Sequence, residues 1–124
     1  MGFQESLEEI CQGLDGALAA SVMGYDGIAV ALLEMESSEA EEAGVNASSA
    51  MVEYSNIFGQ VRTAAAQLQA GQASELAIRT DKLVAIGRVL NNDYFVVVAM
   101  QPEGNLGKAR YLLRVRAAKI AAEL

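Results

Sequence analysis

The sequence predicts a single α/β (α+β) domain whose elements follow the order α-β-β-α-β-β-β-α. Three observations predict it. Apolar residues recur at helical spacing in three segments, two apolar runs flank a glycine-containing turn, and three strand-like runs follow one another between turn residues. With 124 residues, 52% of them hydrophobic and 20% charged, the chain is the size of one ordinary domain and long enough to bury one core.

The N-terminal segment predicts a short amphipathic helix over residues 3–13, closing near Gly13. Its apolar side chains recur at spacings of three and four: Phe3, Leu7, Ile10 and Leu14. Cys11 lies beside this stripe, and as the only cysteine it forms no internal disulfide. We therefore expect Cys11 to be a small core residue.

A β-hairpin is expected next. Residues 16–23 and 28–33 are apolar runs separated by Gly24-Tyr25-Asp26-Gly27, in which glycine supplies the positive φ that hairpin turns use. The following segment, residues 34–46, is acidic, rich in Ser and Ala and without periodicity. It predicts a surface loop, and nothing in it specifies a ligand.

A long helix is expected to begin at a cap on Ser48 or Ser49, run to about Gln69 and stop near Gly71. One side of it is bulky and predicts a core stripe, with Ile57 and Ala64 on its flank. The stripe consists of Met51, Tyr54, Phe58, Val61, Ala65 and Leu68.

The opposite side of this helix carries short side chains: Val52, Gly59, Thr63, Ala66 and Ala70. Short side chains let a second helix approach closely, and the Thr63 hydroxyl can bond to the carbonyl four residues earlier. Two interpretations stay open. The face packs against a partner's helix, or it is a solvated face on which alanine simply favours helix.

Three strands are expected to follow as an antiparallel meander, over residues 74–80, 82–90 and 93–101. The run from Tyr94 to Met100 is apolar on both faces and should lie centrally in the sheet. Residues 74–80 alternate in character and predict an edge strand. An edge strand beside a helix with a second packing face is a natural place for two subunits to extend one sheet.

A last helix is expected from about Asn105 to Leu124. Its apolar side consists of Leu106, Ala109, Leu113, Ala117, Ile120 and Leu124, and its other side carries Lys108, Arg110, Arg114, Arg116 and Lys119. The basic side is either a solvated face that offsets the acidic first helix or a docking surface for an acidic partner.

Charge is divided unevenly along the chain. Residues 1–61 hold eleven acidic and no basic residues, whereas residues 62–124 hold nine basic and five acidic ones. This asymmetry suggests oppositely charged surfaces for oriented docking, or two solvated faces of one globule. The net charge of −7 argues against nucleic acid as a partner.

The residues needed for common catalytic sites are missing from the sequence. Without histidine there is no Ser-His or Cys-His pair, and with one thiol a zinc site is not expected. No phosphate-binding loop motif is present, and the stretch Gly104–Lys108 has the wrong spacing for one. The adjacent carboxylates Glu8-Glu9 and Glu41-Glu42 are interpreted as surface charge. We expect a protein that is not an enzyme and binds no cofactor or metal.

An arginine supplied to a partner GTPase is a separate possibility, because one such residue greatly stabilises the transition state of hydrolysis. Arg62, Arg79, Arg88 and Arg110 are the formal candidates, and nothing in the sequence separates them from ordinary surface arginines. No apolar stretch is long enough to cross a bilayer, and the N-terminus has no signal-peptide pattern. A cytoplasmic protein without membrane insertion is expected.

Two segments resemble the roadblock/dynein light chain family over nearly the whole chain. Residues 16–30 look like its first hairpin with the Asp-Gly turn, and Asn105–Arg110 looks like the start of its final helix, Leu-Gly-x-x-Arg. Within the family, the sequence is similar to bacterial roadblock proteins of gliding motility through three shorter segments: Ser21–Gly24, Val52–Tyr54 and Gly107–Tyr111.

The resemblance implies a roadblock-like sandwich: a five-stranded antiparallel sheet with one long helix on one face and the two terminal helices on the other. It also implies a homodimer through the long helix and the third strand. The corresponding interface residues are Val52, Gly59, Thr63, Ala66, Ala70, Leu76, Ala77, Ile78 and Arg79.

The function expected from this resemblance is that of a non-catalytic homodimeric adaptor in a polarity or motility switch, binding a second roadblock protein, a Ras-like GTPase, or both. One alternative is a GTPase-activating protein that lends no arginine. A further alternative is a small-molecule sensor. The acidic segment 34–42 departs from typical light chains, so the family's partner-binding surface is not carried over directly to this sequence.

Overall fold

The computed structural model describes residues 2–35 and 46–124 of the chain. These residues form three helices and five strands in the predicted order. The elements are α1 (Gly2–Gln12), β1 (Ala17–Gly24), β2 (Ala29–Glu34), α3 (Ala47–Gln67), β3 (Glu75–Arg79), β4 (Val84–Val89), β5 (Tyr94–Met100) and α4 (Leu106–Ala122). Most of the loop predicted over residues 34–46 lies outside the described residues, and Glu34 belongs to β2.

All five strands form one antiparallel sheet in the order β2-β1-β5-β4-β3. β5 lies at its centre, and its residues from Phe95 to Met100 are fully buried, as predicted from their apolar character on both faces. β3 lies at one edge, so the prediction that residues 74–80 form an edge strand is confirmed. β2 forms the other edge.

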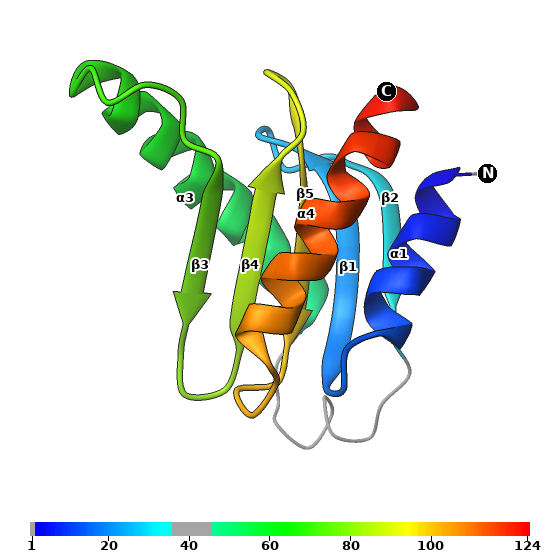
Figure 1. Ribbon diagram of the computed structural model, residues 1–124. Coiled ribbons are helices and arrows are strands. Elements are labelled where there is room, and N and C mark those ends of the chain that lie inside the picture. Colours follow the sequence, from blue (N-terminus) through cyan, green and yellow to red (C-terminus); the bar gives the residue numbers. More distant parts are fainter. Residues whose placement is uncertain (1, 36–45) are drawn as a thin grey trace.

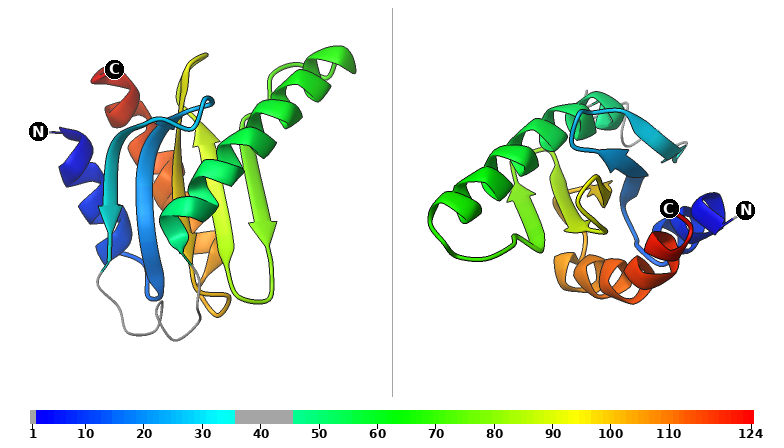
Figure 2. Two further views of the ribbon diagram at one scale, coloured as in Figure 1. Left: turned by 180° about the vertical axis from the view of Figure 1, so that it is seen from behind. Right: turned by 90° about the horizontal axis from the view of Figure 1, so that it is seen from above.

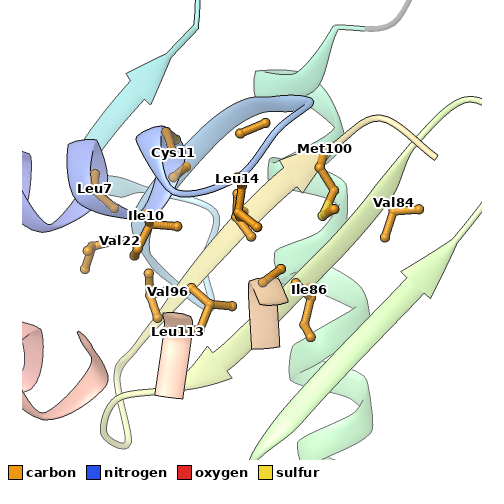
Figure 3. Close-up of a cluster of buried hydrophobic side chains, with 14 of the residues drawn as sticks. Leu7, Ile10, Cys11, Leu14, Val22, Val84, Ile86, Val96, Met100 and Leu113 are labelled. Carbon is orange, nitrogen blue, oxygen red and sulfur yellow. The ribbon is translucent and has the colours of Figure 1, made fainter. Parts of the chain in front are cut away.

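The sheet separates two layers of helix (Figure 1). α1 and α4 lie side by side on one face, and α3 crosses the other (Figure 2). Side chains of α1 and α4 meet the sheet in a cluster that includes Leu7, Ile10, Val96 and Leu113 (Figure 3). Cys11 lies in this cluster with 2% of its surface exposed, so its predicted place in the core is confirmed.

Aromatic rings hold the core on the α3 side. Phe58 is fully buried, and its ring centroid lies 5.7 Å from those of Tyr25 and Tyr54 and 5.4 Å from that of Phe95. The contacts with Tyr25 and Tyr54 are edge-to-face, the favoured arrangement for aromatic pairs. The hairpin tip, α3 and β5 are thereby joined in one cluster.

Asparagine side chains cap both long helices. Asn46 caps α3, because its side-chain oxygen accepts a hydrogen bond from the Ser49 amide at 3.0 Å, so the prediction of a cap at Ser48 or Ser49 is wrong by two or three residues. Asn105 caps α4 in the same way, accepting from the Lys108 amide at 3.0 Å. In each case the cap has an extended backbone and satisfies an amide that the helix leaves free.

Candidate functional site

The second half of α3 extends past the sheet. Met51, Tyr54 and Phe58 in its first half are buried against the strands, whereas no residue from 61 to 70 is buried. The predicted core stripe therefore fails at its end: Val61 and Ala65 are half-buried and Leu68 is 77% exposed. The sheet is too narrow to cover the whole helix. α3 runs obliquely past β3, and no strand lies beneath its last turns (Figures 1 and 2).

The predicted small-residue face of α3 is accessible. Val52 is 46% exposed, Gly59 is half-buried, and Thr63, Ala66 and Ala70 are exposed. The Thr63 hydroxyl donates to the Gly59 carbonyl at 3.1 Å, so its hydrogen-bonding capacity is met within the helix. A close-packed partner helix would therefore leave no unsatisfied hydroxyl on this face.

Gly59 has no steric role within its own chain. A Cβ atom placed there meets nothing within 4 Å apart from the helix's own neighbouring backbone, and Gly59 is not among the glycines with positive φ. Glycine in a helix interior nevertheless costs about 1 kcal/mol relative to alanine. The described chain alone offers no reason for this residue, whereas close approach of a second helix would supply one.

The outer edge of β3 is open. Among the described residues, this strand pairs only with β4, which leaves one row of its backbone amides and carbonyls without strand partners. Leu76 and Ile78 pack towards the α3 side of the sheet, while Ala77 and Arg79 are exposed. The projecting end of α3 and the edge strand β3 lie on the same side of the molecule (Figure 1).

The charged side chains of β3 are bound within the chain. Both carboxylate oxygens of Glu75 accept from Nε of Arg110, at 2.8 and 2.9 Å. The Nη1 atom of Arg79 donates to the Pro102 carbonyl at 3.1 Å. Charged residues on an edge strand commonly oppose pairing with another strand. Here both are directed to partners on α4 and the turn before it.

Tyr54 connects the two parts of the predicted dimer interface. Its hydroxyl, on α3, donates to the Leu76 carbonyl on β3. The ring reaches this position because Gly87 lies opposite: a Cβ atom there would come within 2.6 Å of the Tyr54 oxygen. Burial raises the pKa of Tyr54, and the Gly87 backbone only partly opposes that rise, so the phenol stays protonated and keeps its proton to donate.

The predicted basic docking residues on α4 fall into two groups. Arg110 pairs with Glu75, and Arg116 Nε lies 2.8 Å from a Glu9 carboxylate oxygen on α1, close enough for an ion pair though not aligned as a hydrogen bond. These two arginines join elements of the fold. The other three, Lys108, Arg114 and Lys119, are exposed and form no ion pair with another residue in the described ranges.

The arginines considered for a GTPase are also largely engaged. The guanidinium of Arg62 lies 3.9 Å from the centre of the Tyr25 ring, a cation–π contact between α3 and the hairpin tip. Burial raises the pKa of Tyr25, and the charge of Arg62 partly offsets this. Arg79 and Arg110 have the partners described above, and Arg88 is half-buried opposite Glu75 in the β3–β4 register.

Sequence patterns missed two exposed apolar surfaces. One lies on edge strand β2, where Val30 and Leu32 are exposed together with the preceding Ile28, because α3 runs away from this edge (Figure 2). The other lies on α4, where Tyr111 and Val115 are 54% and 45% exposed. The spacing of four between Tyr111 and Val115, outside the predicted apolar side, was the available signal for the second surface.

Two shallow depressions lie along α3. One, of about 380 Å³, is bordered by Tyr25, Asn56 and Thr63, and the other, of about 250 Å³, by Arg62, Ala66 and Asn91. Neither gathers buried polar groups that would orient a small molecule. Within residues 2–35 and 46–124, no cluster of three or more metal-binding side chains occurs, and no helix there is long and apolar enough to span a membrane.

Comparison with known proteins gives matches among solved structures. MglC from Myxococcus xanthus is 42% identical over the full length of both chains, with a TM-score of 0.72. A roadblock/LC7 domain from Streptomyces avermitilis has a TM-score of 0.80 at 10% identity, covering 99% of this chain and 98% of its own. The gliding protein MglB from Thermus thermophilus has a TM-score of 0.76 at 16% identity, covering 98% of this chain and 89% of its own.

The last two matches, at low identity, show a common fold, and the first shows relatedness in sequence as well. No protein-family model matches the sequence, and neither does any curated protein. The resemblance predicted from residues 16–30 and 105–110 is confirmed, including its narrower likeness to gliding-motility roadblock proteins of the MglC type.

Proposed function

This chain belongs to the roadblock/LC7 family as a relative of MglC, and from that membership we propose that it is a non-catalytic homodimeric adaptor in a polarity or motility switch. It acts in the cytoplasm by binding a second roadblock protein, a Ras-like GTPase, or both. Binding is the whole of its mechanism, so it presents surfaces and aligns partners without making or breaking bonds.

The exposed second half of α3 carries this proposal. A helix of 21 residues that packs on its sheet only in its first half leaves small side chains and a sterically unexplained Gly59 available to a second helix. The open edge of β3 lies beside it and can continue its ladder into the β3 strand of a second copy. A two-fold axis between the two copies places the same helix and the same strand of each chain in contact.

Light scattering tests the dimer. The wild-type chain is expected to have twice the mass of the 13.1 kDa monomer. The variant Ala66→Glu places a charge in the small-residue face and should shift the protein to monomer, because burying an unpaired carboxylate is costly. Ala122→Glu, at an exposed position on α4, is the matched control and should stay dimeric. If the Ala66→Glu protein is still a dimer, the proposed interface through α3 is wrong.

Affinity purification of the tagged chain from its native cells, followed by mass spectrometry, tests the adaptor role. Recovery of a roadblock protein or a Ras-like GTPase supports the role and names the partner. A lower recovery with Ala66→Glu would show that the small-residue face of α3 contributes to binding. Recovery of neither contradicts it. The adaptor proposal further predicts that adding the chain to the recovered GTPase leaves the rate of GTP hydrolysis unchanged, whereas an activator would raise it.

A further inference from the structure

The outer face of α4 carries a strip of apolar side chains that the fold does not use. Ala109, Leu113 and Ile120 point into the core and are buried. On the opposite side, Tyr111 and Val115 are followed by the exposed Ala118 and Ala122, at successive spacings of four, three and four. Such spacing places all four on one line along the helix.

Cations border this strip on both sides. Helical geometry places Lys108 and Lys119 along one border and Arg114 along the other. The guanidinium of Arg114 lies 5.8 Å from the centre of the Tyr111 ring, so charge and apolar surface are adjacent. These are the three basic residues of α4 that form no ion pair with another described residue, whereas Arg110 and Arg116 are held by Glu75 and Glu9.

We propose that this face of α4 is a docking surface for an acidic amphipathic helix of a partner protein. Apolar side chains of that helix would pack on the Tyr111–Val115 strip, and its flanking carboxylates would face Lys108, Arg114 and Lys119. The inference rests on the proposed adaptor role and adds to it a surface separate from α3 and β3. One face of the protein then holds the dimer, and another holds the partner.

The surroundings of α4 favour a narrow protein partner over a membrane. α1 lies beside α4 on the same face of the sheet and exposes Glu5 and Glu8 (Figures 1 and 2). A flat anionic bilayer would meet both helices and be repelled by these carboxylates and by the net charge of −7. A single helix, about 10 Å across, contacts α4 alone and avoids α1.

A designed peptide provides the probe. A fluorescent helical peptide of about 18 residues, with leucines along one face and glutamates beside them, should bind the wild-type chain in fluorescence anisotropy. A scrambled peptide of the same composition should not. Affinity for the designed peptide should fall as salt is raised, because screening weakens the charge pairs at the border of the strip.

Variants locate the binding surface. The double variant Arg114→Glu/Lys119→Glu reverses two charges and should weaken peptide binding by about tenfold or more. Tyr111→Ala, which removes the largest apolar side chain of the strip, should weaken it with less change in salt dependence. Lys82→Glu, an exposed charge reversal in the turn between β3 and β4, is the control and should bind like wild type.

Three results would overturn the inference: equal binding of the scrambled peptide, binding that the α4 variants do not weaken, or binding to vesicles of phosphatidylglycerol and phosphatidylcholine in place of the peptide. Light scattering of each variant separates this inference from the dimer. A dimeric wild-type chain that binds no peptide overturns only the docking surface. A monomeric chain that binds the peptide through α4 overturns only the dimer.

Discussion

Replacing Gly59 with alanine should have opposite effects on the folded chain and on the dimer. Because a Cβ atom at Gly59 meets nothing within 4 Å in its own chain, the methyl group is accommodated without rearrangement. Alanine also favours helix over glycine, so Gly59→Ala should raise the free energy of unfolding of a single chain by roughly 0.5–1 kcal/mol.

In the proposed dimer the same methyl group enters a close contact between two α3 helices. Overpacking of a tight contact costs about 1–3 kcal/mol. At 1.4 kcal/mol for each factor of ten, the dissociation constant of the dimer should rise by roughly 5- to 150-fold. An ordinary solvated face would give only the first effect, since no partner helix would meet the methyl group.

Two measurements separate these effects. Denaturant unfolding at the lowest workable concentration reports the stability of the chain, and a dilution series in sedimentation equilibrium reports the dissociation constant. Gly107→Ala is the matched control, because Gly107 is exposed in the first turn of α4 and its Cβ would lie at an ordinary 3.4 Å from the Asn105 side chain. A Gly59→Ala protein that dimerises as tightly as wild type would refute a helix contact at this residue.

Two further predictions concern stability. Tyr54→Phe removes the donor to the Leu76 carbonyl and should destabilise the chain by about 1 kcal/mol in denaturant unfolding, and an effect below about 0.3 kcal/mol would mean that this hydrogen bond contributes nothing net. Burial raises the pKa of Cys11 from 9.0 to about 11. The unfolded thiol therefore ionises first, and stability should fall as the pH rises from 9 through 11. Cys11→Ala should reduce that fall, and unfolding curves of equal pH dependence in the two proteins would contradict the prediction.

The sheet was predictable because its signals are local. The run from Tyr94 to Met100 is apolar at every position, which only a strand covered on both faces tolerates, and β5 is indeed central. The alternation in residues 75–79 marked β3 as an edge for the complementary reason. The turn glycines and the spacing of apolar residues in each helix predicted the order of the remaining elements along the chain.

Features that depend on distant parts of the chain were missed. The periodicity of α3 indicates which side of the helix faces the sheet, but not how many strands lie beneath it, so Leu68 was placed in the core although it is 77% exposed. Likewise, no local pattern indicates that Arg110 pairs with Glu75, 35 residues away. The predicted docking residues on α4 therefore included arginines that form ion pairs within the chain. The helix cap was misplaced because Asn46, Ser48 and Ser49 all have capping side chains.

Cysteine cross-linking along α3 tests most directly whether two copies meet at this helix. In a Cys11→Ser background, single cysteines at Thr63, Ala66 and Ala70 are compared with one at Ala118 on the outer face of α4. A two-fold contact through α3 brings the position nearest its axis closest to its own copy, and a disulfide forms where the two Cα atoms lie within roughly 7 Å of each other. We expect that position to form covalent dimers much faster than Ala118→Cys. Cross-linking at every α3 position no faster than at Ala118 would contradict a dimer through α3.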